Sequence, residues 1–230
     1  MNGSSPLRIV VLGRGRMGQS VKEVAESRGH EVIGPWGREE VAAVDWPDVD
    51  VAIDFTTPEA ATGVFRACRE RNLPLVSGTT GWLHDLDAVE QAVKAAGHPM
   101  LWAPNFSVGI HLFRKALAEV QETLAESTWS IHVEEVHHTG KVDAPSGTAL
   151  AIGEDLQGRG APVVPIHAQR LPGVPGTHEV VWQNEVDRIS LSHSAKNRSG
   201  FAKGAVLCAE WLVVQAPPFD KIHSMEDVWG

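Results

Sequence analysis

Residues 134–149 hold the densest cluster of chemically capable side chains in the chain, and they read EEVHHTGKVDAPSGTA. Histidine titrates near neutral pH, and lysine supplies a cation that can also give up a proton. The Ser-Gly-Thr step begins a predicted helix, whose unpaired backbone N–H groups suit a carboxylate. The segment therefore predicts a site for a small anionic molecule whose reaction needs a proton. Its candidate residues are His137, His138, Lys141, Ser146, Gly147 and Thr148.

The same region could instead bind a metal ion through His132, His137 and His138. Metal sites recur with characteristic ligand spacings. The chain offers no HExxH motif, no cysteine partner for these histidines and no paired-carboxylate spacing. We therefore predict that the site holds no metal.

A second group of ligand-binding residues lies near the start of the chain. The run Gly13-Arg14-Gly15-Arg16-Met17-Gly18 has the pattern G-x-G-x-x-G between a predicted strand and a predicted helix. The first glycine permits a tight turn, the second lets backbone approach a pyrophosphate, and the third lets the helix pack close to the strand. The context favours dinucleotide binding over a purely structural glycine turn.

The acidic residue that usually follows the second strand of such a fold, where it binds the ribose hydroxyls, is missing. That strand leads instead into Gly34-Pro35-Trp36-Gly37-Arg38. Arg38 could meet a 2′-phosphate, which would favour NADP, or could lie on a solvated loop. NADPH and NADH therefore both remain open as the cofactor.

The elements that position these residues follow two patterns. Up to about Asn105, short apolar strands alternate with helices, which predicts a parallel sheet covered by helices on both faces. Thr57 and Pro58 begin one of the helices, as a cap and a first-turn proline do. The predicted strands are Leu7–Leu12, His30–Ile33, Val49–Phe55, Leu75–Ser77 and Met100–Ala103, and two of the predicted helices run from Pro58 to about Arg71 and over 86–96.

The second half of the chain changes pattern. Val108–Glu126 predicts one long amphipathic helix, and Ile131 and Val133 alternate with polar residues as in a half-buried strand. Further strands follow with few helices between them, which is typical of an α+β domain with a mixed or antiparallel sheet. The expected elements are strands at Trp129–Val136, Val163–Ala168, His178–Gln183 and Arg188–His193, and a closing helix at Phe201–Gln215.

Composition excludes several classes of protein. The chain has 230 residues, 43% of them hydrophobic and 21% charged, which argues against global disorder and allows one large or two small domains. The net charge of −9 argues against a general binder of nucleic-acid backbones. No apolar run reaches the ~20 residues that span a bilayer, and the start lacks the features of a signal peptide. With two cysteines and no disulfide framework, a cytoplasmic location is expected.

The segment at 134–149 closely resembles the signature of the dihydrodipicolinate reductase family, which acts in bacterial lysine and diaminopimelate biosynthesis. Further matches lie in order along the chain from Leu7 onward. They are GRMG at 15–18, DFT at 54–56, GTTG at 78–81, APNFSVG at 103–109 and FAKGAV at 201–206.

The resemblance implies a Rossmann-type nucleotide-binding domain at 1–106 plus 207–230. An inserted α+β domain at 107–206 would bind the substrate and build a homotetramer. The implied reaction is the NADPH- or NADH-dependent reduction of 4-hydroxy-tetrahydrodipicolinate to tetrahydrodipicolinate, with loss of water. Negative charge develops on the substrate as hydride adds, so a proton must arrive from a group such as the His137/Lys141 pair.

The resemblance also implies roles for individual residues. His137 is similar to the family's catalytic acid/base, and Lys141 to its proton donor. His138, Ser146, Gly147 and Thr148, with Lys141, would hold a substrate carboxylate, and Arg170 is a further candidate cation. The residues that would line the cofactor are Gly13, Arg14, Gly15, Arg16, Met17, Phe55, Thr56, Gly78, Thr79, Thr80, Ala103, Pro104, Asn105 and Phe106.

The chain departs from the family pattern on the adenosine side. The first two glycines of the turn are closer together than in most members, and Thr57 stands where many members have Arg. Two other functions share the glycine turn: an aspartate or homoserine dehydrogenase-like enzyme, and a non-catalytic NAD(P) sensor. Neither requires the whole string at 137–148, so the sequence favours the reductase.

Overall fold

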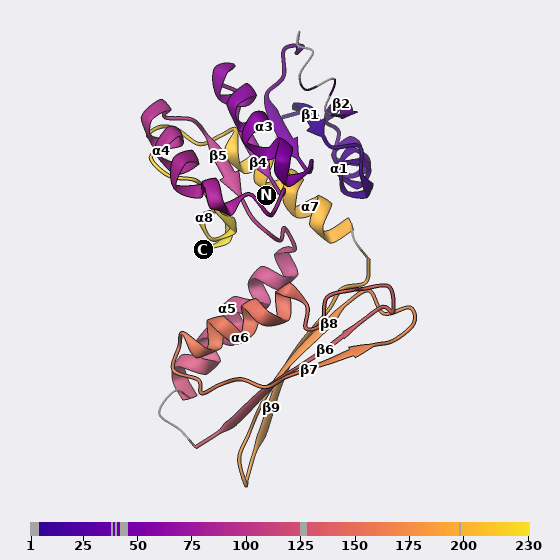
Figure 1. Cartoon of the computed structure of the whole chain (residues 1–230), viewed down its shortest axis with the longest axis vertical. Helices are drawn as coiled ribbons and strands as arrows, with labels where there is room; N and C mark the ends of the chain where they lie inside the picture. The colour runs from indigo at the N-terminus through magenta and orange to yellow at the C-terminus, as the bar shows by residue number, and fades with distance from the viewer. Residues whose placement is uncertain (1–4, 38, 40, 42–45, 125–127, 198) are drawn as a thin grey trace. The chain divides into compact units, whose positions relative to one another are not determined.

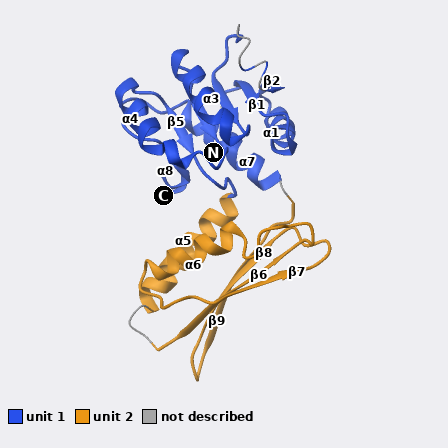
Figure 2. Ribbon diagram, viewed as in Figure 1, with its two compact units in different colours: residues 1–107, 199–230 blue, residues 108–198 orange. Residues whose placement is uncertain are grey.

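The computed structural model describes residues 5–37, 39, 41, 46–124, 128–197 and 199–230. The chain divides into two compact units, which Figure 2 colours separately. Unit 1 combines Met1–Ser107 with Ser199–Gly230, and unit 2 is Val108–Arg198. Arg38, the residue considered for a 2′-phosphate, lies outside the described residues. No helix in the described ranges is both long and apolar enough to cross a membrane.

Unit 1 is built on a five-stranded parallel sheet with the order β2-β1-β3-β4-β5 (Figure 1). This arrangement confirms the predicted Rossmann-type α/β fold. The strands are near-continuous apolar runs because helices shield a parallel sheet from water. Their bounds are β1 Arg8–Leu12, β2 Glu31–Trp36, β3 Val51–Asp54, β4 Leu75–Ser77 and β5 Met100–Trp102.

The helices of unit 1 connect and cover these strands. Val10 and Leu12 of β1 pack with apolar residues of α3 and α4, while α7 contacts α1, β3, β4 and β5. Pro58 occupies the first turn of α3, where its missing N–H leaves no bond unmade. The helices are α1 Arg16–Ser27, α3 Pro58–Glu70, the short η1 Leu83–Asp85, α4 Leu86–Ala96, α7 Ser199–Leu212 and α8 Met225–Trp229.

The chain returns to unit 1 at Ser199, eight residues before the expected boundary at 207. The reason is that α7 is one continuous helix packed on the first sheet. A Cβ on Gly204 would lie 1.7 Å from the carbonyl oxygen of Phe106, so the helix approaches that backbone as closely as a glycine allows. Glu210 of α7 also accepts hydrogen bonds from Arg28 at 2.7 and 2.8 Å and lies 2.8 Å from His30 Nε2.

In the described residues of unit 2, a four-stranded mixed sheet is combined with two helices. The strand order is β7-β6-β8-β9, with β6 and β7 parallel and the other pairs antiparallel. Helices α5 and α6 contact each other and lie together against the sheet (Figure 1). The bounds are α5 Val108–Leu124, β6 Ser130–His137, α6 Gly147–Gln157, β7 Ile166–Arg170, β8 Thr177–Gln183 and β9 Arg188–Ser194.

Strand β6 determines which side chains reach the interior of unit 2. Ile131 and Val133 are buried with Ile152 of α6 and Trp182 of β8. The two-residue period of a strand then places Glu135 and His137 on the same inward face, and both are buried. The strand therefore starts in the apolar core and ends in an ionisable cluster.

Candidate active site

The glycine turn of unit 1 has the geometry of a phosphate cradle. Gly13 has φ +109°, and a Cβ there would lie 2.2 Å from the Phe55 carbonyl oxygen. A Cβ on Gly18 would lie 1.8 Å from the carbonyl oxygen of Gly13. At Gly15, the N-cap of α1, a Cβ would meet no neighbouring atom within 4 Å. The outer glycines are thus required by packing, and the middle one leaves open space at a positive helix end.

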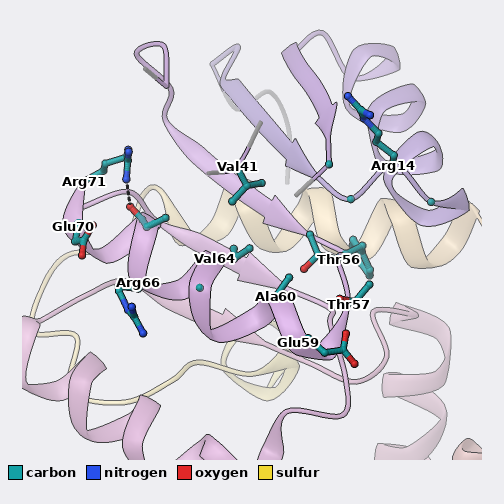
Figure 3. A pocket seen from close by; sticks show the side chains of 16 residues that line it. Arg14, Val41, Thr56, Thr57, Glu59, Ala60, Val64, Arg66, Glu70 and Arg71 are labelled. Atoms are coloured by element: carbon teal, nitrogen blue, oxygen red, sulfur yellow. Dashed lines mark hydrogen bonds between the residues drawn. The ribbon is translucent and has the colours of Figure 1, made fainter. Parts of the chain in front are cut away.

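A pocket of about 770 Å³ opens beside this turn (Figure 3). Five of the predicted cofactor residues line it: Gly13, Arg14, Gly15, Phe55 and Thr56. Arg16 and Met17 are not among its lining residues. The pocket continues along α3, whose helical spacing places Ala60, Gly63, Val64, Ala67 and Arg71 on one side, together with Glu59, Arg66 and Glu70. These α3 residues were not predicted from the sequence, although a spacing of three to four residues marks one face of a helix.

Asp54 connects the two loops that follow β3 and β4. Its side chain is 1% exposed, and one oxygen accepts hydrogen bonds from the Thr56 N–H at 2.9 Å and hydroxyl at 2.7 Å. The other oxygen accepts from the hydroxyls of Ser77 and Thr79, each at 2.8 Å. Burial raises the pKa of Asp54, and these hydrogen bonds oppose that shift. Asp54 therefore holds both loops at the same edge of the sheet.

Thr79 faces the protein interior more than a ligand. It is 4% exposed, its hydroxyl donates to Asp54, and its carbonyl oxygen accepts the indole N–H groups of Trp82 and Trp102 at 2.8 Å each. Gly78 lies against the Phe55 ring, because a Cβ there would be 2.1 Å from Cε1 of that ring. Thr80 is exposed. Among the three predicted residues of this loop, Thr80 presents its side chain to solvent.

The 103–106 segment is mostly structural in its side chains. Ala103 and Phe106 are buried, and the Phe106 ring contacts Phe55 edge-on with ring centres 5.9 Å apart. Asn105 Oδ1 accepts the backbone N–H of Ser107 at 2.8 Å, and Pro104 is exposed. The segment thus completes the hydrophobic support beneath the loop at 54–56.

Unit 2 places His137, one of the two predicted proton-transfer residues, against the buried carboxylate of Glu135. His137 Nδ1 lies 2.8 Å from Glu135 Oε2, a close contact whose alignment falls short of a hydrogen bond. Arg170 NH1 lies 2.9 Å from the other oxygen, Oε1, and the Ser146 N–H donates to the same Oε1 at 3.1 Å. The fully buried carboxylate thus contacts an imidazole on one side and a guanidinium on the other. The cluster therefore holds one carboxylate directly beside the imidazole of His137.

Strand register explains why these residues meet. In the parallel β6/β7 pair, His137 is opposite Arg170, and in the antiparallel β6/β8 pair Glu135 is opposite His178. The His137 and His178 rings are edge-on at 5.1 Å. His178 Nε2 lies 3.2 Å from the hydroxyl of Ser146, which caps α6 by accepting the Ala149 N–H.

The electrostatics of the cluster are set by burial and by neighbouring charges. Burial lowers the pKa of His137, and Glu135 opposes the shift while Lys141 and Arg170 add to it. Burial likewise lowers the pKa of His178 to about 4. For Glu135, burial would raise the pKa, but hydrogen bonds from Ser146 and Arg170 outweigh it and hold the carboxyl below its usual range. The carboxylate is therefore ionised at neutral pH.

Lys141 and the N-terminus of α6 both contact the carboxylate of Asp143. Lys141 Nζ lies 2.8 Å from Asp143 Oδ1, while the Gly147 N–H donates to Asp143 Oδ2 at 3.4 Å. The Asp143 carboxylate thus occupies the donors predicted for a substrate carboxylate, and Lys141 lowers its pKa. Thr148 is half-buried next along the helix, and His138 is half-buried before the turn. An incoming carboxylate would compete with Asp143 for these groups.

Arg170, a candidate cation for a substrate carboxylate, is paired in this structure with a carboxylate of the protein itself. Its guanidinium contacts Glu135 and donates to the carbonyl oxygens of Gln169 and Asp143. Glu135, His137 and His178 also bring one potential ligand atom each within 4.8 Å of one another, a spacing that a metal ion could use. Because Arg170 already neutralises Glu135 and Lys141 is nearby, a second cation there would be repelled. The prediction that the site holds no metal remains a prediction.

The fold and these two groups of residues define a class: an α/β protein with a Rossmann-type unit and an inserted unit that carries a His/Lys cluster. Residues 7–106 match the family model described as dihydrodipicolinate reductase, N-terminus, and residues 109–229 match the one described as its C-terminus. The chain belongs to the dihydrodipicolinate reductase family.

Relatives of known name agree with this assignment. The chain is 36% identical over 223 residues to a 4-hydroxy-tetrahydrodipicolinate reductase of Christiangramia forsetii, covering 90% of this chain and 92% of the other. It is 35% identical over 224 residues to one of Bdellovibrio bacteriovorus, covering 95% and 96%. A solved structure of dipicolinate-bound dihydrodipicolinate reductase from Paenisporosarcina sp. TG-14 shares the fold, with TM-score 0.78, 21% identity and 96% and 98% coverage.

Proposed function

We propose that this protein is an NAD(P)H-dependent oxidoreductase that reduces 4-hydroxy-tetrahydrodipicolinate to tetrahydrodipicolinate, with loss of water, in diaminopimelate and lysine biosynthesis. The observation that carries the proposal is the folded form of the 134–149 segment. It places the buried Glu135–His137 pair, Lys141 and the N-terminus of α6 in one cluster. That cluster supplies what an anionic imine needs, namely a proton and a cationic binding surface.

The cofactor is NADPH or NADH, and the residues of unit 1 fit such a group. The open space at Gly15 lies at the positive end of α1, beside the pocket of about 770 Å³. Bound there, a reduced nicotinamide cofactor supplies the hydride. Gly13, Arg14 and Gly15 would hold the pyrophosphate, and Phe55 and Thr56 would form the neighbouring wall. Arg66 and Arg71 offer further cations along α3.

Protons would move through unit 2. As the substrate gains electrons, negative charge spreads from the imine to the enamine carbon, and a cation close to it stabilises that charge. His137 would act as acid/base because Glu135 favours its protonated form against burial. Lys141, which Asp143 now holds, would donate the proton to the substrate. The backbone N–H groups at Gly147 and Thr148, the Ser146 cap and the His138 side chain would bind a substrate carboxylate.

We further propose a cytoplasmic homotetramer. Support comes from unit 2, where α5 and α6 lie together against the sheet and β9 forms an edge strand of serines alternating with larger residues. The unpaired backbone N–H and C=O groups of an edge strand are usually paired with another chain or covered by other elements. Sedimentation velocity on the full chain at micromolar concentration tests this, and a monomer would contradict it.

One assay tests the proposed function. The unstable substrate is generated in place by condensing pyruvate with aspartate semialdehyde, and the absorbance of NADPH or NADH is followed with purified protein. We expect oxidation of at least one cofactor, and none when pyruvate is omitted. Absence of oxidation with both cofactors would refute the proposal. Oxidation of an amino acid with NAD(P)+ in parallel reactions would favour the dehydrogenase alternative, and cofactor binding without turnover would favour a sensor.

A further inference from the structure

Glu135 is an ionised group that has no role of its own in the proposed proton transfers. Its side chain is 0% exposed, and each of its oxygens has a different partner. Oε2 faces His137 at 2.8 Å, whereas Oε1 faces Arg170 at 2.9 Å and the Ser146 N–H at 3.1 Å. Burying a charge this completely is unfavourable unless its partners compensate. Such an arrangement in the proposed site requires an explanation beyond packing.

We propose that Glu135 is the positioning residue of His137: its ion-pair contact at Nδ1 fixes the imidazole, so that Nε2 is the atom that exchanges protons with the substrate. This inference rests on the proposed function. A neutral histidine carries its proton on the nitrogen nearest a carboxylate, which fixes the tautomer and the ring orientation. With Nδ1 protonated and facing Glu135, Nε2 is left as the basic atom.

The surroundings of Nε2 agree with this assignment. Gly176 has φ +157°, and a Cβ there would lie 2.8 Å from Nε2 and 3.0 Å from Cδ2 of His137. A side chain at position 176 would therefore press directly on the reactive nitrogen. Glycine at that point leaves the Nε2 side unblocked, while Nδ1 is closed off by Glu135 and β6.

Arg170 and Ser146 position the carboxylate in turn. If Oε1 had no donors, Glu135 could rotate or take up a proton, and its hold on His137 would weaken. The guanidinium reaches Oε1 from β7, and the Ser146 N–H reaches it from the turn that begins α6. The substrate-binding turn and the acid/base are thus linked through one carboxylate. A carboxylate ligand at the start of α6 would act on the same turn.

Several charged and titratable groups face His137, and their effects on it differ in sign. Glu135 on β6 favours the imidazolium, whereas Lys141 on the following loop and Arg170 on β7 disfavour it. His178 on β8 packs edge-on and has a pKa lowered by burial to about 4, so it is neutral at pH 7. Glu135 is therefore the one negative charge among the described groups that contact or act on this ring.

In a turnover, the imidazolium would give the proton on Nε2 to the substrate and keep the proton on Nδ1. The Nε2–H bond breaks as the new bond to the substrate forms, directly or through Lys141, and the ring becomes neutral. Solvent then returns a proton to Nε2. Glu135 stays ionised throughout, because its role is to hold Nδ1–H and stabilise the positive ring.

The variant Glu135→Gln tests the charge while preserving the shape. The amide oxygen of glutamine can still accept hydrogen bonds from Ser146 and Arg170. The substitution removes the negative charge beside His137. We expect kcat at pH 7.5 to fall by roughly 10²- to 10⁴-fold, as when an orienting carboxylate is neutralised. The limb of the pH profile that reports His137 should move at least about one unit to lower pH. KM for the nicotinamide cofactor should change less than about twofold.

Glu134→Gln is the matched control, because Glu134 is the preceding residue of the same strand and faces the other way. Its side chain is 48% exposed, and His132 Nε2 lies 3.5 Å from it. Glu134→Gln should keep the wild-type pH profile, and Glu135→Asp should recover the wild-type limb in part. A Glu135→Gln enzyme with wild-type kcat and pH profile would overturn the proposal.

A measurement on the unmodified protein covers the case in which Glu135→Gln does not fold. Nitrogen-15 NMR of the imidazoles, assigned with a His137→Gln variant, reports which ring nitrogen carries the proton above the pKa. We expect His137 in the Nδ1–H tautomer, and an Nε2–H tautomer would overturn the proposal. The measurement needs no substrate. Failure of the wild-type protein in the reductase assay would therefore count against the proposed function, and the wrong tautomer against Glu135.

Discussion

Among single residues, the proposed chemistry depends on the His137 imidazole, which is buried, and on the Lys141 amine, which is more exposed. His137 is buried, and its protonated form depends on one carboxylate. Lys141 is more exposed and is paired with Asp143 at 2.8 Å, a carboxylate that lies 55% exposed. Breaking the Lys141–Asp143 ion pair therefore costs little free energy, because water can solvate the exposed Asp143 carboxylate. Breaking the Glu135–His137 contact costs more, because it leaves a buried charge without that partner.

Lys141→Ala is predicted to lose most turnover while cofactor binding persists. The substitution removes the proposed proton donor and one cation of the anion site, but the residues around the pocket of unit 1 are unchanged. We expect kcat to fall by roughly 10²–10⁴-fold, the usual range for general acid/base groups. Steady-state assays and fluorescence titration with NADPH measure the two effects.

Lys94→Ala serves as its control, because Lys94 lies in the last turn of α4, in the other unit. Near-normal turnover in Lys141→Ala would remove Lys141 from the proton-donor role.

At the scale of elements, the ends of β3 and β4 are joined by Asp54 rather than by backbone alone. Four hydrogen bonds converge on one buried carboxylate, from Thr56, Ser77 and Thr79. The same loops carry predicted cofactor residues. A substitution of Asp54 should therefore affect both the stability of the protein and its affinity for the nucleotide.

Asp54→Ala is predicted to destabilise the protein by about 3 kcal/mol, since it leaves several buried donors without an acceptor. It should also weaken NADPH binding, because the loops at 54–56 and 78–80 lose their common anchor. Ser77→Ala removes one of the four donors and should lower the free energy of unfolding by only about 1 kcal/mol. Urea unfolding and calorimetric titration would measure both, and an Asp54→Ala protein with unchanged stability and affinity would contradict this role of Asp54.

At the scale of the whole molecule, the net charge of −9 contrasts with two proposed anionic ligands. Attraction must come from local features rather than from the overall field. The start of α1 at Gly15, the start of α6 at Ser146, Lys141 and the arginines along the pocket provide these local positive regions.

Acid is predicted to destabilise the fold through buried histidines. His98 is 1% exposed, neither of its ring nitrogens has a hydrogen-bond partner among the described residues, and burial lowers its pKa to about 4. The unfolded chain binds the proton near pH 6.5, so the stability that neutral His98 allows is fully present above about pH 6.5. It is lost as the pH falls toward about 4.

The size of this loss is on the order of 3 kcal/mol between those two pKa values. Urea unfolding of wild type and His98→Leu at pH 7.5 and pH 4.5 measures it. The difference in free energy of unfolding between the two proteins should shift in favour of the variant at the lower pH. His178 has the same sign of effect in unit 2 and is present in both proteins, so it cancels. An equal difference at both pH values would contradict the prediction.

Four features could be predicted from local patterns in the sequence: the alternation of strands and helices in unit 1, the mixed α+β character of unit 2, the G-x-G-x-x-G turn and the His/Lys string. These features are local in the chain, because periodicity, turn chemistry and motif spacing act over neighbouring residues. The family followed from the same local strings. Even the inward direction of Glu135 could have been read from the alternation of Ile131 and Val133 along one strand.

The residues that come from distant parts of the chain to complete the sites became apparent only in the folded structure. Arg170 meets Glu135 through the β6/β7 register, Asp54 meets Thr79 across two strands, and α7 returns to the first unit eight residues before the expected boundary. Thr79 turns inward because its hydroxyl donates to the buried Asp54 and its carbonyl oxygen accepts two indole N–H groups. Strand register and helix packing depend on the free energy of the assembled core, in which pairs far apart in sequence become neighbours, and no local pattern encodes that outcome.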